Sequence, residues 1–398
     1  MPKLLQINVC CNVYSTGKIC EQIGLSAKKV GWDSYIAYAR GFKPSQSTTI
    51  KVGRKLDVYL HYALQRIFDI EGLASRRATK KLVKEIDTIK PDIVQLHNIH
   101  DHYLNYKILF EYLNSSDIKV VWTFHDCWAF TGHCFHFVTK QCDRWRTGCY
   151  DCPLKDEYPE TFLDRSVENY ALKRHLFSGS PNLTIVPCSD WMDAFVKQSF
   201  LKEKKTFVIK NGVDLQTFKP VTTQEFQLTK EDYNIIAVST VWNKEKGYDD
   251  VLKLRSILPP NYIITLVGLT QEQKDSLPDG IIGIQRTQNV HELVELYSNA
   301  DVLINPTYAD TFPTVNLEAL ACGTPVITYN TGGSPESIDE FTGIVVQQGN
   351  VNDLAMAIQR LHTCPLSRRD CRSRAETLFD KEKCFDKYIE LYNRILSE

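Results

Sequence analysis

The sequence predicts an α/β protein built from two doubly wound, parallel-sheet domains. Short apolar segments of strand length alternate with longer amphipathic segments of helical period along almost the whole chain. The alternation stops in a polar stretch at 215–232 and then starts again. A chain of 398 residues is also too long for one hydrophobic core. We therefore expect two domains of ordinary size that are joined by a linker.

Composition places the chain among ordinary soluble globular proteins. Hydrophobic residues make up 43% and charged residues 24%, and the formal net charge of -1 gives no indication of nucleic acid as a partner. No apolar run is long enough to cross a bilayer, and the N-terminus has the pattern of a strand rather than a signal peptide. The thirteen cysteines lie mostly within expected strands and helices, which is typical of reduced, buried thiols. We expect a cytoplasmic protein.

The first domain is predicted to span residues 1–214 and ends at an Asn-Gly turn signal. Its expected strands are 3–9, 34–39, 92–96, 119–124, 183–188 and 207–209, and its main expected helices are 56–68, 75–89, 166–177 and 190–200. The second domain is predicted at 233–380. Its expected strands are 234–239, 262–267, 281–285, 301–305, 325–329 and 342–346, with helices at 248–258, 290–300, 315–321 and 352–361. A last helix, 381–398, carries a clear apolar stripe.

The stretch 299–337 predicts a ligand site at the carboxyl edge of the second sheet. It has the pattern of a βαβ unit, whose first loop and following helix N-terminus lie where open α/β folds bind ligands. Pro313 suits the first helical turn, so the N–H groups of Thr314 and Val315 should lack intrahelical partners and could bind a phosphate. Asp310 and Glu318 flank these groups, and their carboxylates could accept hydrogen bonds from sugar hydroxyls.

The sequence Glu318-Ala-Leu-Ala-Cys-Gly-Thr-Pro-Val-Ile327 resembles the donor-site signature of the retaining glycosyltransferases of family 4. Asp310 stands where that family more often has glutamate. The resemblance covers nearly the whole chain and implies a GT-B fold, in which two Rossmann-like domains face a central cleft. It also implies that the helix 381–398 packs back on the first domain. A helix that simply finishes the second domain is the alternative.

The resemblance assigns further donor contacts. Lys246, followed by Gly247, matches the family's donor-phosphate lysine, and Arg286 stands where the family commonly recognises the base. An arginine that often precedes that lysine by five residues is replaced by Val241 here. Gly17, in the first βα turn, matches a loop that faces the diphosphate, although a plain helix start explains it about as well.

Histidines follow two expected strands of the first domain. The segment after 92–96 contains His97, Asn98 and His100, which we interpret as acceptor-sugar contacts or local hydrogen bonds rather than metal ligands. His125 follows the strand 119–124, and the resemblance places it beside the donor sugar. The expected catalytic residues are therefore His125, Lys246 and Asp310.

The segment 127–153 is an aromatic-rich insert with five cysteines and little periodicity. A long irregular loop inside a compact domain is expected to have a stabilising cross-link or a function. Cys134, Cys142, Cys149 and Cys152 could complete a structural zinc site, or the loop could pack without metal. The insert is similar to that of a subgroup associated with bacterial surface polysaccharides, which suggests that it shapes the acceptor pocket.

The prediction is a metal-independent transferase, because no D-x-D sequence occurs and no cofactor is required. It would move a sugar, with retention, from a UDP- or GDP-sugar to a glycan acceptor that is lipid-linked, in capsular, exopolysaccharide or lipopolysaccharide synthesis. A sugar-nucleotide epimerase on the same fold and a non-catalytic sugar-nucleotide-binding module are the alternatives. Such an acceptor implies peripheral contact with the inner face of the membrane. Four lysines form either a basic patch for it or an ordinary solvated face: Lys197, Lys202, Lys204 and Lys205.

Overall fold

The computed structural model describes residues 1–221 and 232–398 and divides the chain into two compact units. Unit 1 comprises Met1–Lys210 together with Phe385–Glu398, and unit 2 comprises Asn211–Cys384. The division falls before the predicted linker at 215–232, part of which lies outside the described residues. Val213 belongs to unit 2 because it forms an isolated parallel bridge with Asp380, and Lys381 Nζ forms an ion pair with Asp214 at 2.9 Å.

Unit 1 contains a seven-stranded parallel sheet in the order β3-β2-β1-β4-β5-β6-β7. The strands are β1 (Lys3–Ile7), β2 (Asp33–Tyr38), β3 (Thr48–Lys51), β4 (Ile93–Leu96), β5 (Lys119–Phe124), β6 (Leu183–Pro187) and β7 (Lys205–Thr206). The helices are α1 (Tyr14–Lys29), α2 (Lys55–Phe68), α3 (Arg76–Ile89), α4 (Tyr106–Asn114), α5 (Ser166–Ser178), α6 (Asp190–Val196) and most of α13 (Lys381–Ser397).

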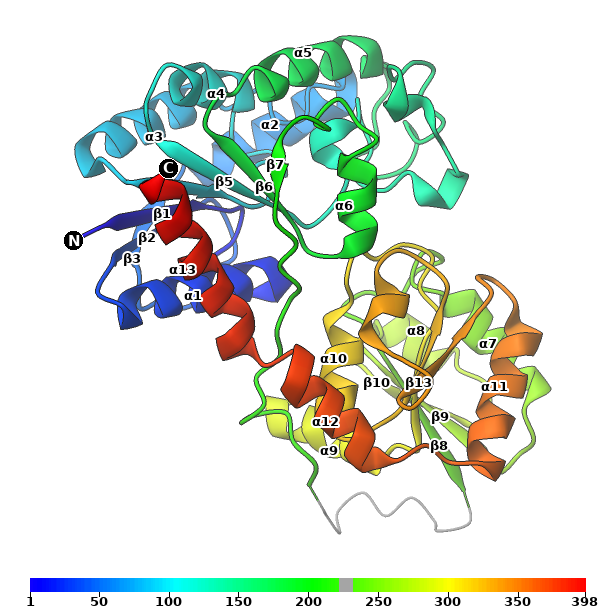
Figure 1. The fold of residues 1–398 in the computed structure, drawn as a ribbon. Helices are drawn as coiled ribbons and strands as arrows, with labels where there is room; N and C mark the ends of the chain where they lie inside the picture. Colours follow the sequence, from blue (N-terminus) through cyan, green and yellow to red (C-terminus); the bar gives the residue numbers. More distant parts are fainter. Residues whose placement is uncertain (222–231) are drawn as a thin grey trace. The chain divides into compact units, whose positions relative to one another are not determined.

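Helices cover both faces of this sheet (Figure 1). Because side chains alternate along a strand, Leu5 and Val120 pack in one core with α3, α4 and α5, whereas Leu4 and Val121 pack in another with α1 and α13. This is the arrangement of a doubly wound fold, and it explains why the strands are apolar on both faces.

The C-terminal helix is part of unit 1 from Phe385 onward. Tyr388 Oη lies 3.2 Å from Thr123 Oγ1 of β5, and the ring of Tyr392 packs on Trp32 with centroids 5.6 Å apart. Tyr388 and Tyr392 are both buried in the core on the α1 face. The apolar stripe of α13 therefore covers the first sheet.

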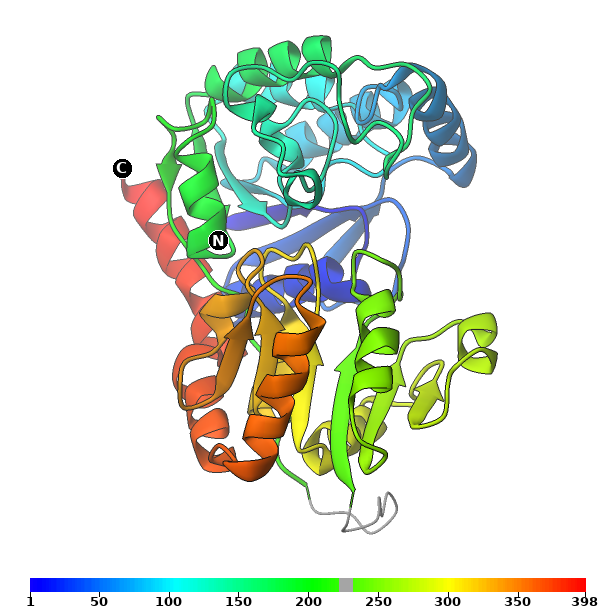
Figure 2. The same cartoon turned by 90° about the vertical axis from the view of Figure 1, so that its right-hand side faces the viewer.

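Unit 2 contains a six-stranded parallel sheet in the order β10-β9-β8-β11-β12-β13. The strands are β8 (Tyr233–Val238), β9 (Tyr262–Val267), β10 (Ile281–Ile284), β11 (Val302–Asn305), β12 (Val326–Tyr329) and β13 (Gly343–Val346). The helices are α7 (Tyr248–Ile257), α8 (Gln271–Asp275), α9 (Val290–Asn299), α10 (Thr314–Ala321), α11 (Val351–Thr363) and α12 (Arg368–Leu378). Figure 2 shows α7 and α11 on the same face of this sheet, where their apolar side chains share one core.

The strand order of each sheet places a topological switch point at its centre. In unit 1 the chain changes direction across the sheet between β1 and β4, and in unit 2 it does so between β8 and β11. Loops leave the carboxyl ends of these two strands in opposite directions, which opens a crevice where such sheets bind ligands. Both switch points are followed by residues that the sequence singled out.

Replacing Tyr392 with alanine should destabilise unit 1. The change removes a buried aromatic ring from the core between α13 and the sheet, and such truncations cost about 3 to 5 kcal/mol of unfolding free energy. Urea denaturation followed by tryptophan fluorescence measures the unfolding free energy of unit 1. The signal reports on this unit because five of the six tryptophans lie in it and only Trp242 lies in unit 2. Lys387→Ala, an exposed change on the same helix, is the control and should alter the unfolding free energy by less than about 0.5 kcal/mol. Equal stability of the two variants would contradict this packing.

Candidate active site

Two loops at the switch point of unit 2 are joined by an ion pair. Lys246, in the loop after β8, places its Nζ 2.9 Å from Oδ2 of Asp310 in the loop after β11. The same ammonium group donates to the carbonyl of Ala309 at 3.4 Å. The side chain of Lys246 is 34% exposed and that of Asp310 is 25% exposed, so both can reach a ligand from solvent. The structure thus brings together two of the predicted catalytic residues.

Close backbone packing fixes these loops. Tyr308 N donates to Glu245 O at 2.8 Å, which ties the loop after β11 to the loop after β8. Gly247 has φ of 76°, and a Cβ there would lie 2.2 Å from the carbonyl oxygen of Pro306. Gly332 has φ of 57°, and its Cβ would lie 1.7 Å from the carbonyl oxygen of Asp310. Only glycine allows these approaches, so the two glycines hold the Lys246 and Asp310 loops in position.

The surroundings of Lys246 keep its ammonium group protonated. Burial alone would lower the pKa of its ammonium group, but the Asp310 carboxylate raises the pKa above the ordinary value through its charge and its hydrogen bond. Lys246 is therefore a cation at neutral pH. An ammonium group on a flexible stem is suited to binding a phosphate as a point charge.

Helix α10 begins beside this pair. Pro313 is its N-cap residue, with no capping side chain, and Thr314 and Val315 are its first two residues. The first N–H groups of a helix have no intrahelical acceptors, and together with the helix dipole they favour an anion. The prediction of a helix N-terminus at Thr314 and Val315 is confirmed, although Pro313 precedes the helix rather than lying in its first turn.

Glu318 lies farther along α10 and is half-buried. Its Oε2 accepts a hydrogen bond from Tyr297 Oη of α9 at 3.0 Å. Burial and this carboxylate hold the pKa of Tyr297 well above the ordinary range, so the tyrosine is a hydrogen-bond donor. Arg286 follows β10 and is exposed, at the outer strand of the same sheet.

Asn316 is a site residue that the sequence did not reveal. It is buried, accepts from Asn305 Nδ2 at 2.9 Å, and donates to Ser337 Oγ at 2.9 Å. These bonds join the end of β11, the helix α10 and the turn after β12. An asparagine inside a short helix carries no signal of such a role, because the partners are distant in sequence.

A cavity of about 560 Å³ lies at the switch point of unit 1. Asn98, after β4, is one of its lining residues, as the acceptor-site prediction requires. The predicted position of Gly17 is wrong: this residue lies inside α1 rather than in the loop before the helix. A Cβ on Gly17 would lie 2.9 Å from Cys10 Sγ, so packing of α1 against the β1 loop explains this glycine. The cavity is lined by Val9, Cys10, Tyr14, Thr16, Arg40, Gly41, Asn98 and Asp101.

His97 and His125 form a stacked, hydrogen-bonded pair in unit 1. His97 Nδ1 lies 3.0 Å from His125 Nε2, and His97 Nε2 lies 3.2 Å from Gln6 Oε1. Gln6 uses its amide nitrogen to donate to Cys20 O, so its Oε1 must accept from His97. His97 Nδ1 is then an acceptor, and His125 Nε2 donates to it. Burial lowers the pKa of His125 to about 4 and holds the pKa of His97 well below its ordinary value, so both rings are neutral at pH 7.

His100 pairs with a carboxylate rather than with another histidine. It is buried, and its Nε2 lies 2.8 Å from Asp126 Oδ2. Burial opposes charge on both groups, yet their mutual attraction raises the pKa of His100 and lowers that of Asp126 to about 2. This buried ion pair supports the loop that follows β4. Of the three predicted acceptor residues, only Asn98 is among the lining residues of the cavity.

Four of the five cysteines of the insert line a small cavity of about 10 Å³ in unit 1. They are Cys134, Cys142, Cys149 and Cys152, and none of the thirteen cysteines, all of which lie in the described residues, forms a disulfide. His133 lines the same cavity, with Nδ1 2.6 Å from Asp69 Oδ1. Within residues 1–221 and 232–398, no three His, Cys, Asp or Glu side chains are arranged to hold a metal ion. Zinc at these cysteines stays a prediction.

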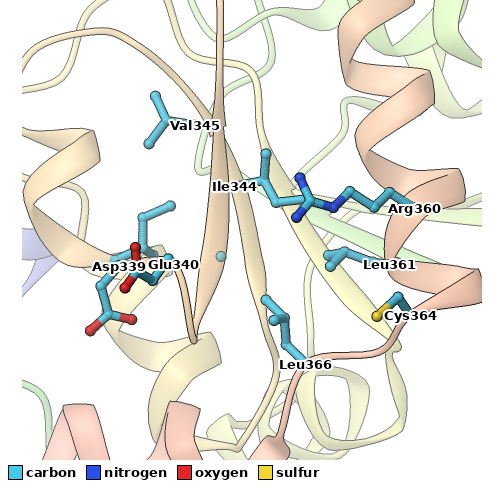
Figure 3. Close-up of a pocket in the computed structure, with 10 residues that line it drawn as sticks. Asp339, Glu340, Ile344, Val345, Arg360, Leu361, Cys364 and Leu366 are labelled. Atoms are coloured by element: carbon cyan, nitrogen blue, oxygen red, sulfur yellow. The ribbon is translucent and has the colours of Figure 1, made fainter.

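A further cavity of unit 2, of about 350 Å³, is lined in part by β13 and α11 (Figure 3), and Lys246 is not one of its lining residues. Its lining residues include Asp339, which precedes β13, and Cys364, which follows α11. It therefore opens at the amino end of the strands. Ligands of doubly wound sheets bind at the carboxyl end, so this cavity is not part of the candidate active site.

Comparison with known proteins identifies the family. Residues 29–217 match the model of Glycosyltransferase Family 4, and residues 221–378 match that of Glycosyl transferases group 1. The chain belongs to the family 4 glycosyltransferases. This transferase is 23% identical to WcaC of Escherichia coli (strain K12), a protein named for colanic acid biosynthesis, over 98% of this chain and 100% of that one.

Solved structures confirm the GT-B fold of the transferase. Sucrose-phosphate synthase from Thermosynechococcus elongatus superposes with a TM-score of 0.75 at 18% identity, over 100% of both chains. Anabaena HepE, solved in complex with UDP, superposes with a TM-score of 0.69 at 14% identity, over 99% of this chain and 100% of that one. No helix within residues 1–221 and 232–398 of the transferase combines the length and apolar character needed to span a bilayer.

Zinc content of the purified transferase tests the prediction for the insert. About one zinc per chain, lost in the Cys149→Ser, Cys152→Ser double variant, would support a four-ligand structural site. A content below about a tenth of that would contradict it. The double variant Cys364→Ser, Cys371→Ser lies in unit 2 and should leave the zinc content unchanged.

Acidification should destabilise the transferase through His125. In the folded state its pKa is about 4, below the unfolded value, so the unfolded chain takes up the proton first as the pH falls. The contribution of neutral His125 is complete above about pH 6.5 and declines as the pH falls toward 4. Denaturation at pH 7 and pH 5 should show that His125→Asn loses less stability than the wild type between these values, by on the order of 1 kcal/mol. An equal loss in both proteins would contradict a neutral His125.

Proposed function

We propose that this glycosyltransferase moves a sugar from a UDP- or GDP-sugar to a hydroxyl of a lipid-linked glycan, with retention at the anomeric carbon. We place the reaction in the synthesis of a bacterial capsule, exopolysaccharide or lipopolysaccharide. The observation that carries the proposal is the Lys246–Asp310 pair beside the uncapped N-terminus of α10, at the switch point of unit 2.

The donor diphosphate is assigned to this point because three kinds of group there suit it. Lys246 supplies a positive charge, the first N–H groups of α10 supply donors, and Asp310 supplies an acceptor for a sugar hydroxyl. We assign Glu318 to the ribose and Arg286 to the base. The complexes of Anabaena HepE with UDP and with UDP-glucose support a nucleotide sugar as donor.

The chemistry follows from where charge develops. When the bond between the anomeric carbon and the diphosphate oxygen breaks, the oxygen keeps the electron pair and negative charge grows on the diphosphate. Lys246 and the amides of Thr314 and Val315 stabilise that charge, and preorganised donors of this kind lower the barrier most. The acceptor oxygen bonds to the anomeric carbon, and its proton passes to the departing diphosphate oxygen. The family resemblance assigns His125 to the sugar, where a neutral ring would hydrogen-bond a hydroxyl.

The acceptor is assigned to the cavity of unit 1, where Asn98 and Arg40 offer donors and Asp101 an acceptor. A surface glycan as acceptor class is supported by the name of WcaC, which refers to colanic acid, and by that of WaaG, a glycosyltransferase of lipopolysaccharide biosynthesis whose structure superposes with a TM-score of 0.68. These names describe the relatives, and the assignment to this chain is our proposal.

Lys246→Ala should lower turnover by roughly two to three orders of magnitude, as does the loss of a preorganised donor to a developing negative charge. Release of nucleoside diphosphate in the presence of a glycan acceptor measures it, after a thermal-shift screen has found the donor that binds. Lys253→Ala, an exposed change on α7, is the control and should keep wild-type turnover.

Near-normal turnover of Lys246→Ala would refute the proposed role. The two alternative functions give different outcomes in the same assay. An epimerase converts the sugar nucleotide to its epimer without acceptor and without release of nucleoside diphosphate. A binding module is stabilised by the donor but shows no turnover.

A further inference from the structure

Helix α2 is amphipathic in the opposite sense to an ordinary surface helix. Its buried residues are two polar side chains, His61 and Gln65. His61 Nδ1 lies 2.9 Å from Ser75 Oγ, and Gln65 Nε2 donates to Pro159 O at 3.1 Å, so hydrogen bonds fix the helix to unit 1, and the half-buried Val58 adds an apolar contact with its core. A soluble surface helix turns its apolar side chains inward, and α2 turns most of them outward.

The outward side chains form a group that we call the apolar face. Two residues outside α2, Phe162 and Leu163, extend this face. They lie next to the helix, because Phe162 N donates to Arg66 O at 2.9 Å. Single exposed apolar residues are common, but a contiguous group of this kind marks an interaction site. Its members are exposed by 42% to 75%: Leu56, Tyr59, Leu60, Tyr62, Ile67, Phe68, Phe162 and Leu163.

Exposed basic residues lie on α3, the helix that follows α2 in the chain. Ala74 N donates to His61 Nε2, so the chain that enters α3 lies against the middle of α2. The first nine residues of α3 carry Arg76, Arg77, Lys80, Lys81 and Lys84, all exposed. In the described part of the chain, none of the five lies within ion-pair distance of a carboxylate. The formal net charge of the whole chain is -1, so this positive charge is a local feature.

The apolar face also reaches the rim of the cavity at the switch point of unit 1. The ring of Tyr62 packs edge-on against His102, with centroids 5.2 Å apart, and His102 directly follows the cavity residue Asp101. Tyr158 Oη donates to Asp101 Oδ1 at 2.6 Å, and its neighbour Pro159 accepts the bond from Gln65 of α2. A surface that covers α2 therefore lies next to the mouth of this cavity.

The four lysines singled out in the sequence do not form such a surface. Lys197 pairs with Asp193 at 2.5 Å, Lys205 pairs with Glu398, and Lys204 donates to Ser180 O. Three of the four charges are thus engaged with groups of unit 1. The basic side chains of α3 have no comparable partners among the described residues.

We propose that α2 and α3 form a docking surface for an anionic phospholipid bilayer. Helix α2 lies in the interfacial plane with its apolar face among the acyl chains, and the basic residues of α3 contact lipid phosphates. Tyrosine and phenylalanine on one side and lysine and arginine on the other are the side chains that this interface favours. The inference rests on the proposed lipid-linked acceptor, since docking brings the cavity mouth to the plane in which such an acceptor diffuses.

Co-sedimentation of the full chain with vesicles tests the proposal. Wild-type protein should bind vesicles of phosphatidylcholine and phosphatidylglycerol, and bind phosphatidylcholine alone much more weakly. Arg77→Gln with Lys81→Gln should weaken binding about twenty-fivefold, because each basic residue near an anionic surface contributes about fivefold. Tyr59→Ser with Leu60→Ser should also weaken it. Phe341→Ser, an equally exposed apolar change in unit 2, and Lys253→Gln are matched controls that should bind like the wild type.

Three outcomes would overturn the proposal. The wild type could stay in the supernatant with anionic vesicles, or both α2–α3 variants could bind as it does. The Tyr59→Ser, Leu60→Ser variant could instead convert a dimer to a monomer in size-exclusion chromatography, which would make the apolar face a contact between copies. Thermal stabilisation of each variant by the donor nucleotide is measured in parallel. A variant that is still stabilised by the nucleotide but no longer binds vesicles has lost docking and kept donor binding. If the proposed transfer reaction is wrong, vesicle binding should be unchanged.

Discussion

The candidate active site depends on the contact between the loops that follow β8 and β11. These strands are neighbours in the sheet of unit 2, and the chain leaves their carboxyl ends in opposite directions. The Lys246–Asp310 ion pair, the Tyr308 to Glu245 backbone bond and the close approach at Gly247 all join the same two loops. Because the loops are held before any ligand binds, the positive charge and the first amides of α10 are preorganised for an anion.

Unit 1 repeats this topology with different chemistry. Its switch point carries the neutral His97 and His125, together with a wide cavity lined by Arg40, Asp101 and the first turn of α1. A neutral His125 can donate to His97 through Nε2 without bringing charge to the site. Unit 2 thus joins a cation to a helix N-terminus, which suits a phosphate, and unit 1 offers a wider cavity with both donors and acceptors. The inverted amphipathicity of α2 adds a property that the catalytic chemistry does not require, namely a surface fitted to a lipid interface.

Most of the fold was predictable from the sequence, because buried parallel strands and amphipathic helices have distinct periods. The helices α4, α8 and α12 were not among the predicted elements, and the other exceptions are at the edges of the sheets. The short strand β3 (Thr48–Lys51) escaped prediction because three of its four residues are exposed, and the predicted strand 207–209 continues beside β6 through backbone bonds from Phe207 and Ile209 without being a regular strand. The domain boundary lay earlier than predicted, because Val213 is held by Phe379 and Lys381, which are distant in sequence.

The site was predictable where its residues directly follow parallel strands. Lys246, Asp310, Thr314 and Val315 follow neighbouring strands, so their meeting at one sheet edge follows from topology. The role of Gly17 was not predictable, because its contact with Cys10 depends on how α1 packs. Nor was the outward face of α2, since helical periodicity alone does not show that hydrogen bonds bury His61 and Gln65.

Hydrogen–deuterium exchange with saturating UDP or GDP tests the central claim most directly, because it locates the bound diphosphate. The account predicts slower exchange in peptides that cover 244–247 and 310–316, and unchanged exchange around the cavity between β13 and α11. Protection that leaves both loops unchanged, or that appears only at that second cavity, would contradict the assignment of the donor site.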